Sequence, residues 1–189
     1  MNSLSGVLIM VLAALPAVAA EDTPLQTSRT VAISLMQQLG AELKKEISAN
    51  GPDAAINVCR NIAPELASKL SIEQGWRVTR VSLKTRNPLL GTPDAWEQQA
   101  LKEFDARAAD GEALDKLEFS ESVSEPGGRY FRYMKALPVQ PLCLACHGSE
   151  QHIPASVKAT LSQQYPHDRA TGYAVGQVRG AISVKRPLL

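Results

Sequence analysis

Residues 143–147 read Cys-Leu-Ala-Cys-His, which is the pattern C-x-x-C-H. This pattern is typical of the attachment site of a c-type haem. Each cysteine sulfur can add to one haem vinyl group, and the two-residue spacer sets the sulfurs at the separation that the vinyl groups require. The histidine that follows is delivered to one face of the ring as the proximal iron ligand. The motif therefore predicts a covalent cofactor, a metal ligand and an export compartment together.

Two other sites could use the same residues. Half of a zinc site needs a second ligand pair, but only Cys59, His152 and His167 remain, and they form no second C-x-x-C or H-x-x-x-H. A thioredoxin-like dithiol needs its motif at the start of a helix in a βαβ unit. Here the motif follows Pro138 and Pro141, which predict a loop. Haem c is the favoured interpretation, with zinc and a redox dithiol as alternatives.

The N-terminal segment agrees with export from the cytoplasm. Residues 6–20 form an apolar run that ends in small residues, and residues 17–19 (Ala-Val-Ala) fit a signal-peptidase pattern. We predict a signal peptide over residues 1–20, a haem-binding domain over residues 21–189 and a periplasmic location. Residues 1–5 contain no Lys or Arg, so an uncleaved anchor is the alternative.

Charge and motif content exclude other classes of function. The formal net charge is +1, which implies neither an acidic nor a basic partner. The sequence contains no basic patch with interleaved aromatic residues and no phosphate-binding glycine loop, so nucleic-acid binding has no support. After the first twenty residues, no apolar stretch is long enough to span a membrane.

Periodicity and turn residues predict an α+β domain. An apolar residue at every fourth position from Val31 to Ile47 predicts a long N-terminal amphipathic helix. This stripe could pair two subunits in a homodimer, although packing on its own domain is favoured. The predicted strands are joined by both hairpin and helical connections, which favours an antiparallel sheet with helices on one side. Helices are expected over residues 24–50, 52–63, 64–70, 93–108 and 154–164, and strands over residues 76–83, 117–123, 129–139 and 178–184.

Several segments together resemble a known family, the single-haem, PAS-like domains of periplasmic proteins and sensor-kinase ectodomains, long catalogued as a domain of unknown function. The resemblance covers nearly the whole chain after the signal peptide. It implies a PAS-like antiparallel sheet flanked by helices, with one haem in a pocket beside it. It also implies that Cys59 matches the sixth iron ligand, opposite His147. The matching segments are residues 55–59, 63–64, 75–78, 82–88, 93–97, 131–135, 143–148 and 168–173.

Two residues compete for the second iron position. Cys59 is the one cysteine that the motif leaves over, and a free thiol in an oxidising compartment needs a reason. Its alternative is a buried, inert thiol. Met134 is the rival ligand, with core packing as its alternative. A thiolate stabilises Fe(III) and lowers the reduction potential, whereas a thioether raises it.

Cationic or hydroxyl side chains usually bind haem propionates. Six residues in or near the matched segments are candidates, with ordinary surface charge as their alternative. They are Arg77, Arg80, Arg86, Arg129, Arg132 and Tyr133.

The functions that follow are a redox or gas sensor with a low-potential haem, or a low-potential electron-transfer cytochrome. The sensor would change its affinity for a signalling partner when a diatomic gas binds or the iron changes oxidation state. A peroxidase-like enzyme ranks third, because no distal acid–base pair can be identified in the sequence.

Overall fold

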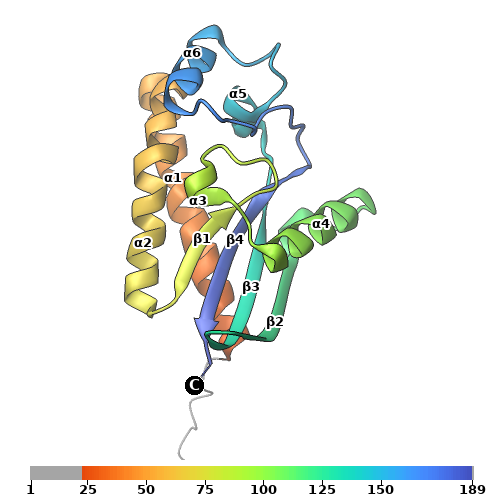
Figure 1. Cartoon of the computed structure of the whole chain (residues 1–189). Helices are drawn as coiled ribbons and strands as arrows, with labels where there is room; N and C mark the ends of the chain where they lie inside the picture. Colours follow the sequence, from red (N-terminus) through yellow and green to blue (C-terminus); the bar gives the residue numbers. More distant parts are fainter. Residues whose placement is uncertain (1–22, 189) are drawn as a thin grey trace, which may run out of the picture.

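A computed structural model describes residues 23–188, so the predicted signal peptide and its cleavage site lie outside the described residues. Four strands form one antiparallel sheet in the order β1-β4-β3-β2 (Figure 1). The strands are β1 (Arg77–Val81), β2 (Glu118–Glu125), β3 (Gly128–Pro138) and β4 (Val178–Pro187). The helices are α1 (Pro24–Asn57), α2 (Ala63–Gln74), α3 (Pro88–Gly91), α4 (Ala95–Ala109), α5 (Leu144–His147) and α6 (Ala155–Gln164), with a π-helical segment η1 (Val58–Ile62) and 3-10 turns η2 (Leu114–Lys116) and η3 (Pro141–Cys143).

The start and the kink of α1 follow from local sequence. Thr23 is the N-cap and its Oγ1 accepts a hydrogen bond from the Gln26 N–H at 3.2 Å. Gly51 has φ 85° and ψ 174°, which glycine adopts without steric cost, and Pro52 follows it. The two helices expected on either side of residue 51 are therefore present as the two halves of a kinked α1.

The apolar stripe of α1 packs on its own domain. Val31 and Leu35 are buried against Tyr133, Ile182 and Val184 of the sheet. In Figure 1, α1 passes behind the strands and α2 runs back beside it. The favoured interpretation, in which the stripe packs on its own domain, is therefore the arrangement that the structure has.

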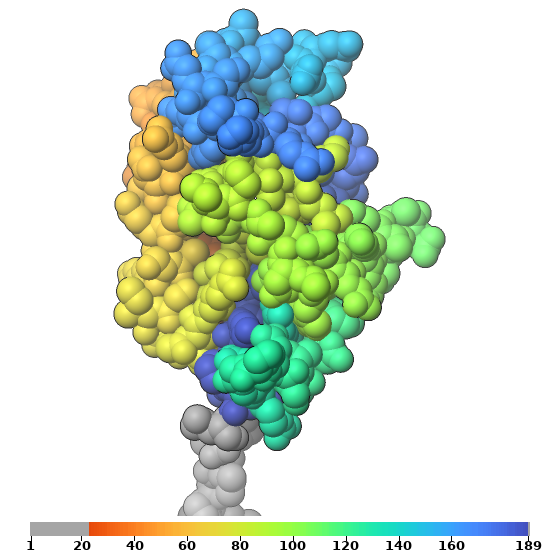
Figure 2. Space-filling model, viewed as in Figure 1, coloured from red at the N-terminus to blue at the C-terminus, as the bar shows by residue number. Residues whose placement is uncertain are grey.

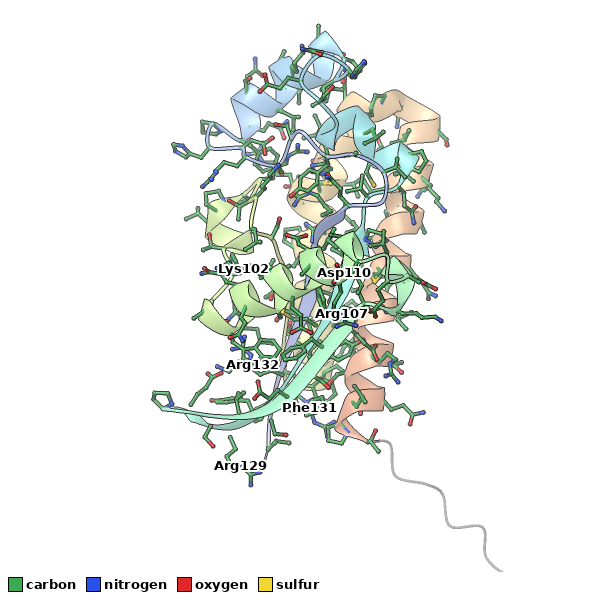
Figure 3. All side chains as sticks on the ribbon, turned by 90° about the vertical axis from the view of Figure 1, so that its right-hand side faces the viewer. Lys102, Arg107, Asp110, Arg129, Phe131 and Arg132 are labelled. Atoms are coloured by element: carbon green, nitrogen blue, oxygen red, sulfur yellow. The ribbon has the colours of Figure 1, made fainter. Side chains whose placement is uncertain are left out.

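Helix α4 covers the opposite face of the sheet, where Leu101 and Phe104 pack against Met134 and Ala181. Figure 3 shows the strands between α4 and α1. The expectation of helices on one side was wrong, because the adjacent β3 residues Tyr133 and Met134 point to opposite faces and are both fully buried, so each face needs a cover. The implied fold, an α+β antiparallel sheet flanked by helices with a long N-terminal helix, is confirmed.

Strand β1 lies at the edge of the sheet and pairs only with β4. Val78 packs with the α1 side of the core and Val81 with the α4 side, which explains the shift in apolar phase along this strand. The C-x-x-C-H segment lies at one end of the sheet, beside α6 and the kinked part of α1 (Figure 1). Within residues 23–188, none of the helices combines the length and the apolar character that a membrane span requires.

Candidate functional site

The C-x-x-C-H segment is a short helical turn rather than the expected irregular loop. Pro141 begins η3, Cys143 ends it, and Cys146 and His147 lie in α5. Gly148 ends the turn, and its N–H donates to the Leu144 carbonyl at 2.9 Å. A Cβ atom at position 148 would lie only 2.6 Å from that carbonyl oxygen, so glycine is required where the chain leaves the turn.

The His147 ring is held by the loop that precedes β4. Its Nδ1 lies 2.7 Å from the Ala170 carbonyl oxygen. Because a carbonyl can only accept, Nδ1 carries the proton and Nε2 keeps a free lone pair. The Tyr173 N–H donates to the His147 carbonyl at 2.9 Å, and the two rings meet edge to face with centroids 6.4 Å apart. This arrangement orients Nε2 as a metal ligand needs.

The surroundings keep His147 neutral. Burial lowers the pKa of its imidazole well below the ordinary value, and the positive charges of Arg179, Arg86 and Arg80 lower it further. Arg179 Nε lies 3.2 Å from His147 Nδ1. Since Nδ1 already carries a proton, this contact is a close approach of two N–H groups and opposes protonation of the ring. A neutral imidazole is the form that binds a metal ion.

An ion pair joins the motif to the same loop. Arg86 Nε donates to Asp168 Oδ2 at 2.9 Å, and its Nη2 donates to the Cys146 carbonyl at 2.6 Å. Asp168 Oδ1 accepts the Ala170 N–H at 2.8 Å. The carbonyl that holds His147 is therefore positioned by a chain of charged hydrogen bonds that also holds α5.

Cys59 lies in the π-helical segment η1, and its side chain is half-buried. Single turns of π-helix inside α-helices occur frequently at functional sites. The pKa of the Cys146 thiol is raised to about 11, mainly by burial and further by the nearby Cys59, Asp53 and Cys143. Cys59 precedes Cys143 by 84 residues in the sequence. The structure nevertheless brings Cys59 and the C-x-x-C-H motif to the same end of the molecule.

The cover of this region is apolar. Cys146 packs against one buried cluster, in which α6 meets the second half of α1. Figure 2 shows α6 and the loop before β4 capping this end of the molecule. The cluster consists of Ile56, Ile153, Val157, Leu161 and Tyr165.

Met134 is not brought to the motif. It is fully buried under α4, among residues such as Leu101, Phe104 and Leu117. The alternative use weighed for Met134, core packing, is the one that the structure shows.

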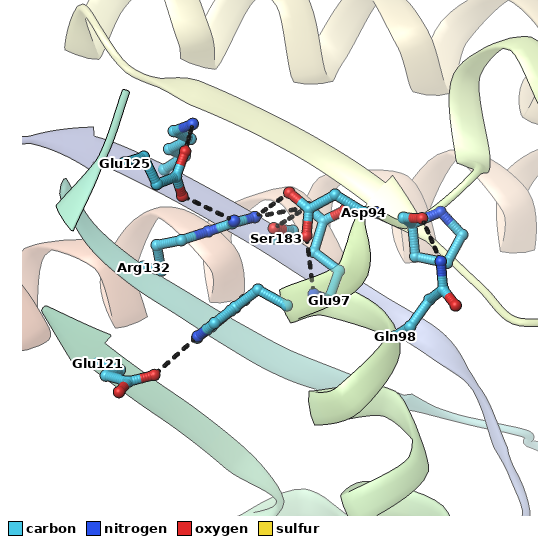
Figure 4. A network of polar contacts seen from close by, with 10 residues as sticks. Asp94, Glu97, Gln98, Glu121, Glu125, Arg132 and Ser183 are labelled. Atoms are coloured by element: carbon cyan, nitrogen blue, oxygen red, sulfur yellow. Dashed lines mark hydrogen bonds and ion pairs between the residues drawn. The ribbon is translucent and has the colours of Figure 1, made fainter. Parts of the chain in front are cut away.

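Arg132 and Tyr133 also lie apart from the motif, although both were candidates for propionate binding. Tyr133 is buried on the α1 side, and its hydroxyl donates to Glu118 Oε2 at 2.8 Å. Arg132 points to the other face, where Nη2 donates to Asp94 Oδ2 at 2.6 Å and lies 3.4 Å from Glu97 Oε1 (Figure 4). Arg132 thus ties β3 to the start of α4, and Tyr133 ties β3 to β2.

Of the other arginine candidates for propionate binding, some lie at the motif and some lie away from it. Arg77 and Arg129 are exposed at the start of β1 and β3. Arg80, also on β1, reaches the π-helical segment, where Nη2 donates to the Cys59 carbonyl at 3.5 Å. Of the six candidates, the structure brings Arg80 and Arg86 to the motif.

Arg179 is a site residue that sequence reasoning missed. It lies on β4 between the buried residues Val178 and Gly180, and an arginine within the otherwise apolar residues 178–182 was the available signal. With Arg80 and Arg86 it surrounds His147 with three positive charges. In the described part of the chain, the Arg86–Asp168 pair is the one ion pair that these arginines make. This end of the molecule can therefore accept anionic groups such as carboxylates.

The alternative chemistries fit less well. Within residues 23–188, His, Cys, Asp and Glu form no group of three or more that could hold a metal ion, as a zinc site would need. A reactive dithiol has a lowered thiol pKa, whereas the pKa of Cys146 is raised. The sheet is antiparallel, so the motif does not lie in a βαβ unit.

Comparison with known proteins agrees with this geometry. The family model described as Tll0287-like matches residues 17–187. The crystal structure of the cyanobacterial heme-protein Tll0287 superimposes with a TM-score of 0.64 at 28% sequence identity, covering 88% of this chain and 98% of that chain. No curated protein matches the chain. The family match confirms the resemblance drawn from the sequence segments.

Proposed function

The chain belongs to the Tll0287-like family, and from this premise we propose that it binds one haem covalently. In this proposal Cys143 and Cys146 would form the thioether bonds that hold the haem, and His147 and Cys59 would be the two protein ligands of its iron. The observation that carries the proposal is that the fold brings the π-helical segment of Cys59 close to the C-x-x-C-H turn, because Ile56, three residues before Cys59, belongs to the cluster against which Cys146 packs. The similarity to the crystal structure of a heme-protein supports it.

The residues present fit a haem. Two thiols and a neutral imidazole with a free Nε2 supply the donor set of a c-type site. Arg80 and Arg86 lie at the motif with positive charge in excess of the nearby acid, which suits two propionates. The apolar cluster around Cys146 suits the porphyrin ring. When bound, the haem supplies an iron centre that can change oxidation state.

The protein residues set the properties of that centre. Ala170 and Tyr173 hold the His147 ring, and the Arg86–Asp168 pair holds Ala170 in turn. The Arg80 contact with the Cys59 carbonyl holds the η1 segment. A thiolate ligand from Cys59 favours Fe(III) and a low reduction potential.

We further propose that the protein is a periplasmic redox or gas sensor. A thiolate that is displaced on reduction would open a coordination position for a diatomic gas, and the change at η1 would pass into α1 and α2. A low-potential electron carrier is the second candidate. It is favoured by the place of the motif at one end of the molecule, where Cys143, Cys146 and His147 are only half-buried.

Covalent attachment is tested by expressing the full chain with the c-haem maturation machinery and staining denaturing gels for haem. We expect haem to stay on the wild-type protein and on Cys59→Ser, and to be lost from the double variant Cys143→Ser/Cys146→Ser. A wild-type protein that releases all haem on denaturation would contradict the proposal.

The two roles are separated by optical spectra of the reduced protein with and without CO. The sensor role predicts that CO binds rapidly to the reduced wild-type protein. A spectrum that stays six-coordinate and unchanged by CO would remove the gas sensor and leave the electron carrier.

A further inference from the structure

A cavity lies next to Arg179, the residue whose Nε approaches His147. It has a volume of about 430 Å³ and opens between α4, the segment after β1 and the loop before β4. Its wall combines apolar and charged side chains. The apolar residues include Leu101, Ala108 and Val178, and the polar ones include Lys84, Tyr173 and Arg179.

The two cations of this cavity converge on one aromatic ring. Lys84 Nζ lies 4.8 Å and the Arg179 guanidinium 5.4 Å from the centre of the Tyr173 ring. Neither cation forms an ion pair with a carboxylate within residues 23–188. Arg179 Nη1 donates to Ser82 Oγ at 2.8 Å and to the Lys84 carbonyl at 3.2 Å, which holds it in place.

One acidic residue, Asp105 on α4, also lines the cavity. Burial raises its pKa, and the charge of Lys84 opposes that rise. The cavity therefore has two cations and one acid, together with apolar side chains. Such a wall suits a small anion that carries an apolar tail.

The cavity is separate from the proposed haem position. Because His147 Nδ1 faces Ala170 and Arg179, the free Nε2 points away from them. Arg179 lines the cavity, and its Nε approaches the Nδ1 side of the imidazole. A ligand in the cavity would thus contact Arg179, which lies between the cavity and His147.

We propose that this cavity binds a short-chain organic carboxylate and that binding is coupled to the iron through Arg179 and His147. The carboxylate pairs with Arg179 and Lys84, and the tail packs on Leu101, Ala108 and Val178. The binding half of the proposal stands on the cavity alone, whereas the coupling half rests on the proposed haem ligation.

The sign of the coupling follows from charge. A bound carboxylate offsets the positive charge of Arg179 next to the imidazole, which stabilises Fe(III) relative to Fe(II). The reduction potential therefore falls when the cavity is filled. By linkage, the oxidised protein binds the carboxylate more tightly than the reduced protein, by the same free energy.

The test is calorimetric titration of the oxidised holoprotein with three probes. Hexanoate has both charge and tail, hexanol has the tail alone, and inorganic phosphate has charge alone. We expect hexanoate to bind at least about tenfold more tightly than either control probe. Absence of hexanoate binding, or equal binding of phosphate, would overturn the proposal.

Variants locate the site. Lys84→Gln and Arg179→Gln should each weaken hexanoate binding by about tenfold or more, as expected for a lost charged contact. Lys102→Gln removes an exposed cation from α4 that does not line the cavity, and it should leave the affinity unchanged. Within residues 23–188, Lys84 forms no hydrogen bond with His147, so its variant remains informative if Arg179→Gln misfolds. Equal affinity of Lys84→Gln and Lys102→Gln would contradict the assignment.

Redox titration with and without saturating hexanoate tests the coupling. A potential that falls in the wild-type protein supports it, and an unchanged potential with hexanoate bound overturns it. If no covalent haem forms, the proposed function fails, and titration of the haem-free protein with hexanoate still decides whether the cavity binds carboxylates.

Discussion

Arg86 and Asp168 form an ion pair across 82 positions of the sequence, with Nε and Oδ2 2.9 Å apart and the side chains only 8% and 12% exposed. The pair joins the carbonyl of Cys146 to the backbone of Ala170, which in turn holds His147. One charged contact thus sets the relation between the motif and the loop behind it.

Asp168→Asn should destabilise the haem-free protein by about 3–5 kcal/mol, because the buried Arg86 would lose its counter-charge. The amide that replaces the carboxylate can still accept the hydrogen bond from the Ala170 N–H. The loss of stability therefore measures the loss of the negative charge. Urea unfolding measures the effect. Asp110→Asn, at an exposed position after α4, should stay within about 0.5 kcal/mol of the wild type. Equal stability of the two variants would show that the ion pair contributes little.

Cys59→Met should raise the reduction potential of the holoprotein, since a thioether favours Fe(II) more than a thiolate does. Cys59→Ala should instead convert the oxidised iron from low spin to high spin. Electron paramagnetic resonance and redox titration measure the two effects. Met134→Leu, a volume-conserving change in the core, is the control and should keep the wild-type spectrum. A spectrum that changes with Met134 and not with Cys59 would reverse the ligand assignment.

Arg132→Met should cost about 3–5 kcal/mol of unfolding free energy, because Glu97, with 2% of its surface exposed, would be left without its cation. Figure 4 shows the two side chains together with Asp94 and Ser183. The exposed Arg129, labelled with Arg132 in Figure 3, provides the control Arg129→Met, for which a change below about 0.5 kcal/mol is expected.

A second substitution separates charge from packing at this network. Adding Glu97→Gln to Arg132→Met removes the unpaired carboxylate and should recover part of the lost stability. A double variant that is less stable than Arg132→Met alone would show that packing, rather than the uncompensated charge, causes the loss.

Glu118→Gln should reduce stability at neutral pH by about 1 kcal/mol and flatten the loss of stability in acid. The hydrogen bond from Arg29 lowers the pKa of the Glu118 carboxyl, and the Tyr133 hydroxyl adds to the effect. A lowered folded-state pKa means that the unfolded chain binds more protons. The stabilisation is therefore present above the ordinary glutamate pKa and is lost as the pH falls through the folded-state pKa.

Thermal unfolding between neutral pH and about pH 3 measures the Glu118 effect, with Glu150→Gln as an exposed control. The wild type and Glu118→Gln should converge in acid, whereas Glu150→Gln should follow the wild type throughout. A gap that stays constant with pH would contradict an electrostatic origin.

Local sequence predicted most of the elements. The start of the first helix at residue 24, the break at residue 51 and the connection between the strands expected over residues 117–123 and 129–139 each depend on residues close in sequence, and the structure has all three. The extension of α2 to Gln74 and the short helix α3 were not predicted, because weak helical signals depend on what packs against them.

The candidate site was only partly predictable. Arg132 and Tyr133 lie on the strand that leads to the motif, so sequence proximity favoured them. Neighbouring residues on a strand point to opposite faces, and these two join different buried contacts away from the motif. Arg179 lies 32 residues beyond His147, and only the pairing of β4 brings it to the imidazole.

The sequence by itself determined the C-x-x-C-H spacing, the helix starts and breaks and the antiparallel hairpin, because these depend on contacts a few residues apart. Only the tertiary structure decided that the segment of Cys59 lies near the motif, that Asp168 positions the loop that holds His147, and that Arg179 joins that imidazole to a cavity. Those contacts bridge distant parts of the chain. They exist because burial of apolar faces on both sides of one sheet brings the segments together.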